Sequence, residues 1–165
     1  MRKNVLIGTA VAAVAALAIG AVTAGGAFAL TSARTIRINA RTAQHNFVDV
    51  APPDISLGDQ LIVREDLRNA SGQNIGHDGV TCTVTGIQSD NDLEFECLLT
   101  AHLKDGDLTV QGFFVEPAEE DASRMGSGVL AVTGGTGVYA NVGGTMDFAE
   151  VSEEEGMYTF HLLAL

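Results

Sequence analysis

Apolar and polar residues alternate in short runs through most of the chain, and Gly, Asp, Asn and Ser separate the runs. Alternation with a period of two is typical of β-strands that bury one face, whereas the 3.6-residue period of amphipathic helices is weak here. The pattern predicts eight strands, near residues 34–42, 59–67, 77–87, 92–103, 107–116, 127–133, 143–151 and 156–164.

The strand predicted at 92–103 shows the clearest alternation. Its apolar face consists of Leu93, Phe95, Cys97, Leu99, Ala101 and Leu103, and its polar face of Asp92, Glu94, Glu96, Thr100 and His102. Tight turn sequences such as Lys104-Asp105-Gly106-Asp107 link neighbouring strands, so we expect consecutive strands to pair antiparallel. Because closure removes the exposed edges of such a sheet, we predict an all-β, eight-stranded antiparallel closed β-barrel, which can enclose a small ligand.

The strand predicted at 107–116 has two largely apolar faces. Its inward face repeats the apolar pattern, and its outward face carries Phe113 and Val115. Exposed apolar side chains of this kind are found at subunit contacts. A homodimer or homotrimer with these two residues at its interface is therefore one alternative to a monomer.

Residues 1–29 have the composition of a secretory signal peptide. A basic start, Met1-Arg2-Lys3-Asn4, precedes a long run of apolar and small residues, and Ala27-Phe28-Ala29 fits the small-x-small cleavage rule. Cleavage after Ala29 predicts a secreted domain of residues 30–165. The alternative is an uncleaved membrane anchor, because the apolar run approaches the roughly 20 residues that span a bilayer. The glycines in the run favour cleavage, since they destabilise a spanning helix.

The charge of the chain makes nucleic acid an unexpected partner. The formal net charge is −12, and loss of Arg2 and Lys3 with the leader would take it to −14. Such a surface repels phosphate backbones. The four histidines, at positions 45, 77, 102 and 161, form no paired metal-binding motif, and two cysteines are too few for a four-ligand zinc site. We therefore expect neither a metal nor a cofactor.

Cys82 and Cys97 are the two cysteines of the chain. A turn centred between Ser89 and Asp90 places them directly opposite each other on the inner faces of two adjacent strands. Because export favours disulfide formation, a cross-strand disulfide is the preferred interpretation, and a pair of thiols inside the barrel is the alternative.

The second half of the sequence resembles the allene oxide cyclase barrel family. The resemblance rests on the segments 106–112 (GDLTVQG), 130–139 (LAVTGGTGVY) and 158–160 (YTF), and it extends from about Leu57 to Leu165. Dirigent proteins share the Gly-Gly-Thr-Gly turn and the barrel. We expect Gly134, Gly135 and Gly137 to form a tight structural turn at the barrel rim, because glycine permits positive φ and close backbone approach. The alternative eight-stranded barrel, the lipocalin, usually begins with a Gly-x-Trp signature, and this chain has no tryptophan.

The resemblance implies a substrate cavity inside the barrel. Cys82 matches a cavity cysteine of the family, whereas Phe114 replaces a cavity tyrosine and so removes a hydroxyl group. Allene oxide itself is therefore not the expected substrate. The residues expected to line or support the cavity are Leu61, Val63, Cys82, Phe95, Cys97, Phe114, Tyr158 and Phe160.

Glu65 is the principal candidate for catalysis. It shares a face with the apolar residues of the strand at 59–67, so it should point inward, where the family has a cavity asparagine. Apolar surroundings disfavour the charged form of a carboxyl group and raise its pKa, which suits a general acid or base. Arg37 and Asn39 in the first strand are candidates for stabilising developing charge. The alternative is a structural Glu65 that pairs with one of these two or with Arg41.

These features favour a cofactor-independent isomerase or cyclase that holds a small apolar molecule in the barrel. Holding reactive groups together can lower a cyclisation barrier by about 7–11 kcal/mol at best, so few catalytic groups are needed. One alternative is a non-catalytic guide of the dirigent type, which sets the stereochemistry of intermediates made by a separate oxidase. Another is a plain hydrophobic ligand-binding protein.

Overall fold

The protein is described by a computed structural model that covers residues 33–50, 54–89, 91–117 and 126–164. The predicted signal peptide, residues 1–29, lies outside the described residues. Within the described part, no helix has the length and apolar character that crossing a membrane requires. The described residues form eight strands: β1 (Ala33–Val48), β2 (Gln60–Arg68), β3 (Asn74–Ile87), β4 (Leu93–Leu103), β5 (Gly106–Glu116), β6 (Ser127–Gly135), β7 (Val142–Ser152) and β8 (Glu155–Ala164).

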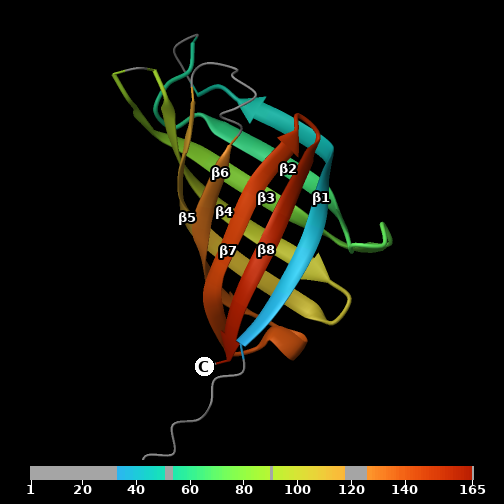
Figure 1. The fold of residues 1–165 in the computed structure, drawn as a ribbon. Helices are drawn as coiled ribbons and strands as arrows, with labels where there is room; N and C mark the ends of the chain where they lie inside the picture. Colours follow the sequence, from blue (N-terminus) through green and yellow to red (C-terminus); the bar gives the residue numbers. More distant parts are fainter. Residues whose placement is uncertain (1–32, 51–53, 90, 118–125, 165) are drawn as a thin grey trace, which may run out of the picture.

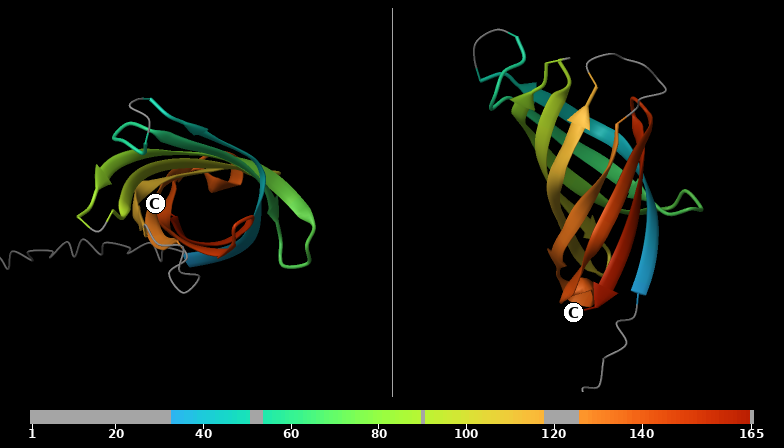
Figure 2. Two further views of the ribbon diagram at one scale, coloured as in Figure 1. Left: turned by 90° about the horizontal axis from the view of Figure 1, so that it is seen from above. Right: turned by 60° about the vertical axis from the view of Figure 1, so that its left-hand side comes forward.

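The strands pair antiparallel in sequence order, and β8 returns to pair with β1, so the sheet closes into a barrel (Figure 1). The view along the barrel in Figure 2 shows the ring that the strands form. The predicted fold is therefore confirmed. Seven strands begin and end within about three residues of the prediction, whereas β1 continues six residues beyond residue 42. A bulge between Thr42 and Gln44 lets this long strand bend while it keeps pairing with β2.

The apolar faces of the strands form the interior. A cluster of buried side chains fills the end of the barrel near the short 3-10 turn η2 (Gly137–Tyr139), and it includes Ile38, Leu67, Leu108, Val132, Phe160 and Leu162. A second, smaller cluster lies on the wall formed by β3 and β4, and it consists of Cys82, Val84, Phe95 and Cys97.

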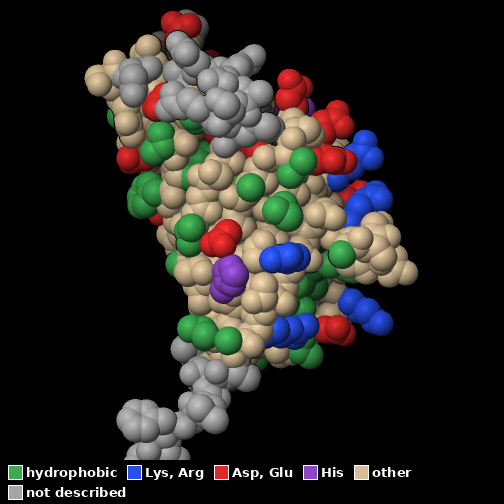
Figure 3. Space-filling model, viewed as in Figure 1, with side chains coloured by type: hydrophobic (Ala, Val, Ile, Leu, Met, Phe, Trp, Pro, Cys, Tyr) green, Lys and Arg blue, Asp and Glu red, His purple; other side chains and the backbone are tan. Residues whose placement is uncertain are grey.

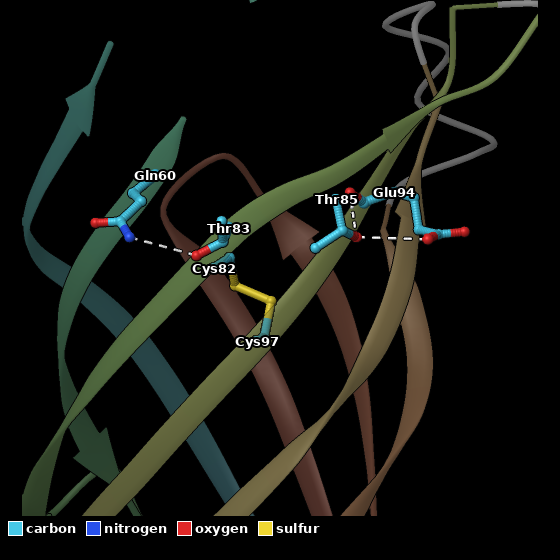
Figure 4. Close-up of a disulfide and its surroundings, with 6 residues drawn as sticks. All are labelled: Gln60, Cys82, Thr83, Thr85, Glu94 and Cys97. Atoms are coloured by element: carbon cyan, nitrogen blue, oxygen red, sulfur yellow. Dashed lines mark hydrogen bonds between the residues drawn. A yellow bond between two sulfur atoms is a disulfide. The ribbon is translucent and has the colours of Figure 1, made fainter. Parts of the chain in front are cut away.

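Cys82 and Cys97 form a disulfide that joins β3 to β4 (Figure 4). The two residues are directly opposite in the β3–β4 pairing, as the turn at Ser89 and Asp90 predicts. Alternate residues point away from the disulfide to the outside, where the Gln60 side-chain amide donates a hydrogen bond to Thr83 Oγ1 at 3.5 Å. The predicted disulfide is confirmed.

The Gly-Gly-Thr-Gly segment closes the end of the barrel at η2. Thr136 donates from its backbone N–H to the Asp107 carbonyl at 2.9 Å and from Oγ1 to Asp107 Oδ2 at 3.1 Å. Gly137 has a φ of +59°, and a Cβ atom there would collide with the carbonyl oxygen of Asp105. The turn thus packs backbone against backbone on the β4–β5 hairpin, which requires glycine at position 137.

Phe113 and Val115 lie on the outer face of β5, as their positions in the strand predict. Their side chains are 58% and 39% exposed. Their place at a contact between subunits stays a prediction.

Candidate functional site

Glu65 and Asp78 face each other across β2 and β3 on the inner side of the barrel. The backbone N–H of Glu65 donates a hydrogen bond to Asp78 Oδ1 at 3.1 Å. Glu65 is only 8% exposed and Asp78 only 1% exposed. Two carboxyl groups so placed repel each other when both are charged, and burial strengthens the repulsion.

Asp78 responds to these surroundings with a strongly perturbed pKa. Burial raises the pKa of its carboxyl group to about 8, and the negative charge of Glu65 adds to the effect. Asp78 Oδ2 is buried and has no hydrogen-bond partner among the described residues. Asp78 therefore keeps its proton at neutral pH, inside the barrel and beside Glu65.

Tyr158 brings a third polar group to the same point from β8. Its hydroxyl group donates a hydrogen bond to Glu65 Oε2, and its side chain is 8% exposed. Burial raises the pKa of Tyr158 well above its usual value, and the neighbouring carboxyl groups of Glu65 and Asp78 raise it further. Tyr158 thus stays a neutral donor. We call Glu65, Asp78 and Tyr158 the acidic cluster.

The acidic cluster lies beside a pocket of about 140 Å³, here called the barrel pocket, at the end of the barrel opposite η2. Glu65 and Tyr158 both line it. Its wall is otherwise mainly apolar and comes from β2 to β8, with Leu61, Val63, Val80, Leu99, Phe114, Leu130, Met146 and Phe148 among the lining residues. The volume is close to that of a cavity that holds benzene.

Six of the eight residues predicted to line the cavity do line the barrel pocket: Leu61, Val63, Cys82, Cys97, Phe114 and Tyr158. The other two support it from behind. Phe95 stacks on Phe114 with ring centroids 5.3 Å apart, and Phe160 is fully buried in the core, edge-on to Tyr158.

Arg37 and Asn39 do not join Glu65, contrary to the expectation that they face the interior. Both are exposed on the outer face of β1, because the residues that alternate with them, Ile38 and Ala40, take the inward positions. Asn39 borders a separate outer groove with Arg41. The structure therefore replaces these expected partners of Glu65 with Tyr158 and Asp78, and we leave Arg37 and Asn39 out of the site.

Glutamates of a single hairpin also line the barrel pocket. Glu150, Glu153 and Glu155, at the β7–β8 turn, all line it. Glu150 Oε2 accepts a hydrogen bond from the backbone N–H of Gly126 at 3.1 Å. Close by, burial and the charge of Glu150 raise the pKa of Glu116 to about 7. Among the residues that the structure describes, no group of three or more His, Cys, Asp or Glu is arranged to hold a metal ion.

The amino-acid sequence matches the model of a known family. The sequence model described as "Allene oxide cyclase barrel like domain" matches residues 34–162, which is most of the chain. None of the curated proteins with which the sequence was compared matches it significantly.

Several solved structures share the barrel. A protein named pyocyanin demethylase is 27% identical, with a TM-score of 0.66 over 78% of this chain and 99% of its own. The Diels–Alderase AbmU from Streptomyces koyangensis is 14% identical, with a TM-score of 0.61 over 84% of this chain and 72% of its own. A pterocarpan synthase dirigent protein is 13% identical, with a TM-score of 0.56 over 80% of this chain and 94% of its own. Because the last two proteins are only 14% and 13% identical to this chain, the similarity to them concerns the fold alone.

Proposed function

Because the chain belongs to the allene oxide cyclase barrel like family, we propose that it is a cofactor-independent isomerase or cyclase whose small, mostly apolar substrate binds in the barrel pocket. One observation carries the proposal: the buried side chain of Glu65 lines an apolar pocket, its carboxyl group accepts from the Tyr158 hydroxyl group, and its backbone N–H donates to the carboxyl group of Asp78. Acids and bases with perturbed surroundings in a pocket are the usual mark of proton-transfer chemistry.

The proposed reaction needs one base and one acid. Glu65 removes a proton from an acidified carbon of the substrate, and the electron pair of that C–H bond moves into a conjugated system. A proton is then returned at a different atom, so the net change is a shift of a double bond with no oxidation or reduction. Asp78, which retains its proton at neutral pH, is the reservoir beside Glu65.

Tyr158 positions the reacting carboxyl group. Its hydroxyl group donates to Glu65 Oε2, so the other oxygen of Glu65 is the one left for the substrate. A hydrogen bond to a carboxylate stabilises its charged form. The apolar wall of Phe114 and Phe148 would hold the substrate body and keep water away from the reacting atoms.

Cyclisation is the related outcome when the substrate carries two groups that can react with each other. Confinement in a pocket of about 140 Å³ restricts the substrate to folded conformations, which lowers the entropic part of the barrier. Solved structures with this fold include a Diels–Alderase and a dirigent protein, which supports small-molecule chemistry inside such a barrel. The N-terminal residues support secretion of the domain.

The proposal is tested with a small-molecule extract of the organism that produces the protein, incubated in ²H₂O with the purified chain and compared by mass spectrometry. We expect one compound to be replaced by an isomer that differs in composition only by one deuterium in place of one hydrogen. The Glu65→Gln variant should leave that compound unchanged, whereas Glu96→Gln, on the outer face of β4, should act like the wild type.

Two other outcomes would contradict catalysis. Binding of a compound without any conversion would indicate a ligand carrier. A change of product stereochemistry that needs an added oxidase would indicate a guide of the dirigent type. Conversion that survives Glu65→Gln would remove Glu65 from the mechanism.

A further inference from the structure

The barrel pocket combines negative charge with aromatic walls. Four glutamates line it, Glu65 in its depth and Glu150, Glu153 and Glu155 at its outer end. Phe114, Phe148 and Tyr158 line it as well, and the rings of the two phenylalanines meet edge to face, 5.2 Å apart. Carboxylates and aromatic faces attract the same kind of partner, a cation.

The protein itself supplies no positive charge to this pocket in the part that the structure describes. The described Lys and Arg residues are Arg34, Arg37, Arg41, Arg64, Arg68 and Lys104, and none of them lines the barrel pocket. The ion pairs of the arginines lie outside the pocket: Arg41 pairs with Glu154 at 3.6 Å, and Arg64 with Asp66 at 3.4 Å.

Figure 3 shows where charged side chains lie on one face of the molecule. Asp and Glu side chains, in red, gather at the upper right of the visible face, where the β7–β8 turn lies in Figure 1. Lys and Arg side chains, in blue, lie beside and below them, and Arg41 pairs with Glu154 of this turn. A pocket with low-dielectric walls and charges of one sign concentrates counter-ions of the opposite sign.

One oxygen of a buried carboxyl group inside the barrel has no hydrogen-bond partner among the described residues. Asp78 is 1% exposed, faces Glu65 across β2 and β3, and its Oδ2 atom has no hydrogen-bond partner among the described residues. Buried carboxyl groups are normally paired with a cation or a donor, because removal from water costs them much of their solvation. A bound neutral hydrocarbon would leave Glu65 with no positive charge beside it.

We infer that the occupant of the barrel pocket is an organic cation: a body of about one or two rings that lies against Phe114 and Phe148 and carries one positive charge toward Glu65. This inference names the substrate class of the proposed function and rests on it. A neutral molecule of the same shape lacks the counter-charge, and an anion is repelled by Glu65 and by the glutamates at the outer end of the pocket.

The test compares three ring systems of similar size by isothermal titration calorimetry on the purified chain: the cation 1-methylquinolinium, the neutral 1-methylnaphthalene and the anion 1-naphthoate. We expect the cation to bind at least tenfold more tightly than the neutral compound, and the anion not to bind. Glu65→Gln should reduce affinity for the cation at least tenfold and leave affinity for 1-methylnaphthalene unchanged or increased.

The outer glutamates offer a matched comparison. Glu153→Gln and Glu155→Gln should each weaken binding of the cation by about twofold to fivefold at low salt, and less at high salt, because exposed charges are screened. Glu154→Gln makes the same change of charge in the same turn, but Glu154 pairs with Arg41 and does not line the pocket, so its effect on the affinity should be smaller than theirs.

Equal binding of the cation and the neutral compound, or tighter binding of 1-naphthoate, would overturn the inference. This result would leave the proposed function standing if extract compounds were still isomerised in a manner that depends on Glu65. Tighter binding of the cation without any isomerisation of extract compounds would instead support an organic cation as the ligand and would contradict the proposed catalytic function.

Discussion

Glu65 and Asp78 occupy directly opposed positions on β2 and β3, and the backbone N–H of one donates to the carboxyl group of the other at 3.1 Å. This pairing places two carboxyl groups on the inner side of a barrel where the described residues provide no basic partner. The pair therefore holds a proton at pH values where isolated carboxyl groups have lost theirs, and this retained proton makes the site suited to acid–base chemistry.

The first prediction concerns stability and pH. In the unfolded chain Asp78 ionises near its ordinary pKa of 3.8, and in the folded chain near 8. The folded state thus binds the proton of Asp78 more tightly than the unfolded state does. The contribution of this proton to the free energy of unfolding is complete below pH 3.8 and is lost as the pH rises to 8. Asp78→Asn keeps the acceptor for the Glu65 N–H and cannot ionise. Its free energy of unfolding should rise relative to the wild type between pH 5 and 8, by an amount on the order of a few kcal/mol.

Urea denaturation at pH 5, 6.5 and 8 measures this difference. Asp66→Asn is the control, because Asp66 lies next to Glu65 in β2 and pairs with Arg64 on the outside. Its effect should be small and nearly constant over the same range. A difference between Asp78→Asn and the wild type that does not change with pH would contradict the assigned protonation of Asp78.

The second prediction concerns Tyr158. Tyr158→Phe keeps the ring and removes the donor to Glu65, so it should lower the rate of substrate isomerisation by about tenfold to a hundredfold. The barrel should still fold, with a loss of about 1–2 kcal/mol of stability in urea. Tyr139→Phe, in η2 at the other end of the barrel, is the control and should not change the rate. A rate that Tyr158→Phe leaves unchanged would show that the hydroxyl group does not position Glu65.

The third prediction concerns the disulfide. The link between Cys82 and Cys97 closes a loop with a sequence separation of 15, for which the chain-entropy estimate is about 3 kcal/mol. The double variant Cys82→Ala/Cys97→Ala should lose about this much stability in urea. Adding a reductant should lower the stability of the wild type toward that of the variant and leave the stability of the variant unchanged. Equal stability of the wild type with and without reductant would contradict this role.

The fourth prediction concerns the Gly-Gly-Thr-Gly turn. Gly137→Ala places a side chain at positive φ and against the Asp105 carbonyl, so it should cost about 1–3 kcal/mol in urea denaturation. Gly79→Ala in β3 is the control, because a Cβ atom there meets nothing within 4 Å. This control should be neutral or slightly stabilising. Equal effects of the two substitutions would show that the turn can move away from β4 and β5.

The alternation of apolar and polar residues is enough to predict most of the fold. Strand β4 illustrates why: five of its six predicted inward residues are buried, with Leu93 at the strand end partly exposed. The predicted register also places Cys82 opposite Cys97, and a bulge between Val84 and Gly86 separates this pair from the turn before β4. The extension of β1 was missed because its last residues, from about His45 onward, are exposed and show no alternation.

The sequence predicts only part of the candidate site. Glu65 is identified by its face. The resemblance does not reach the first strand, so Arg37 and Asn39 had no family pattern behind them, and alternation with Ile38 and Ala40 places them outside. Sequence analysis did not identify Asp78, although the alternation in β3 places it on the same face as Cys82, which points inward. The contact of Tyr158 with Glu65 joins residues 93 positions apart, and alternation along one strand does not report which residues meet across a barrel.

The central claim is that Glu65 is a reactive base in an apolar pocket, and the ring opening of 5-nitrobenzisoxazole tests it without knowledge of the natural substrate. A base removes the proton at carbon 3 of this compound, the N–O bond breaks, and a coloured cyanonitrophenolate is released. We predict that the purified chain accelerates this release well above the rate with the same concentration of acetate, that Glu65→Gln abolishes the acceleration, and that Glu96→Gln retains it. Equal rates for the wild type and Glu65→Gln would contradict the claim.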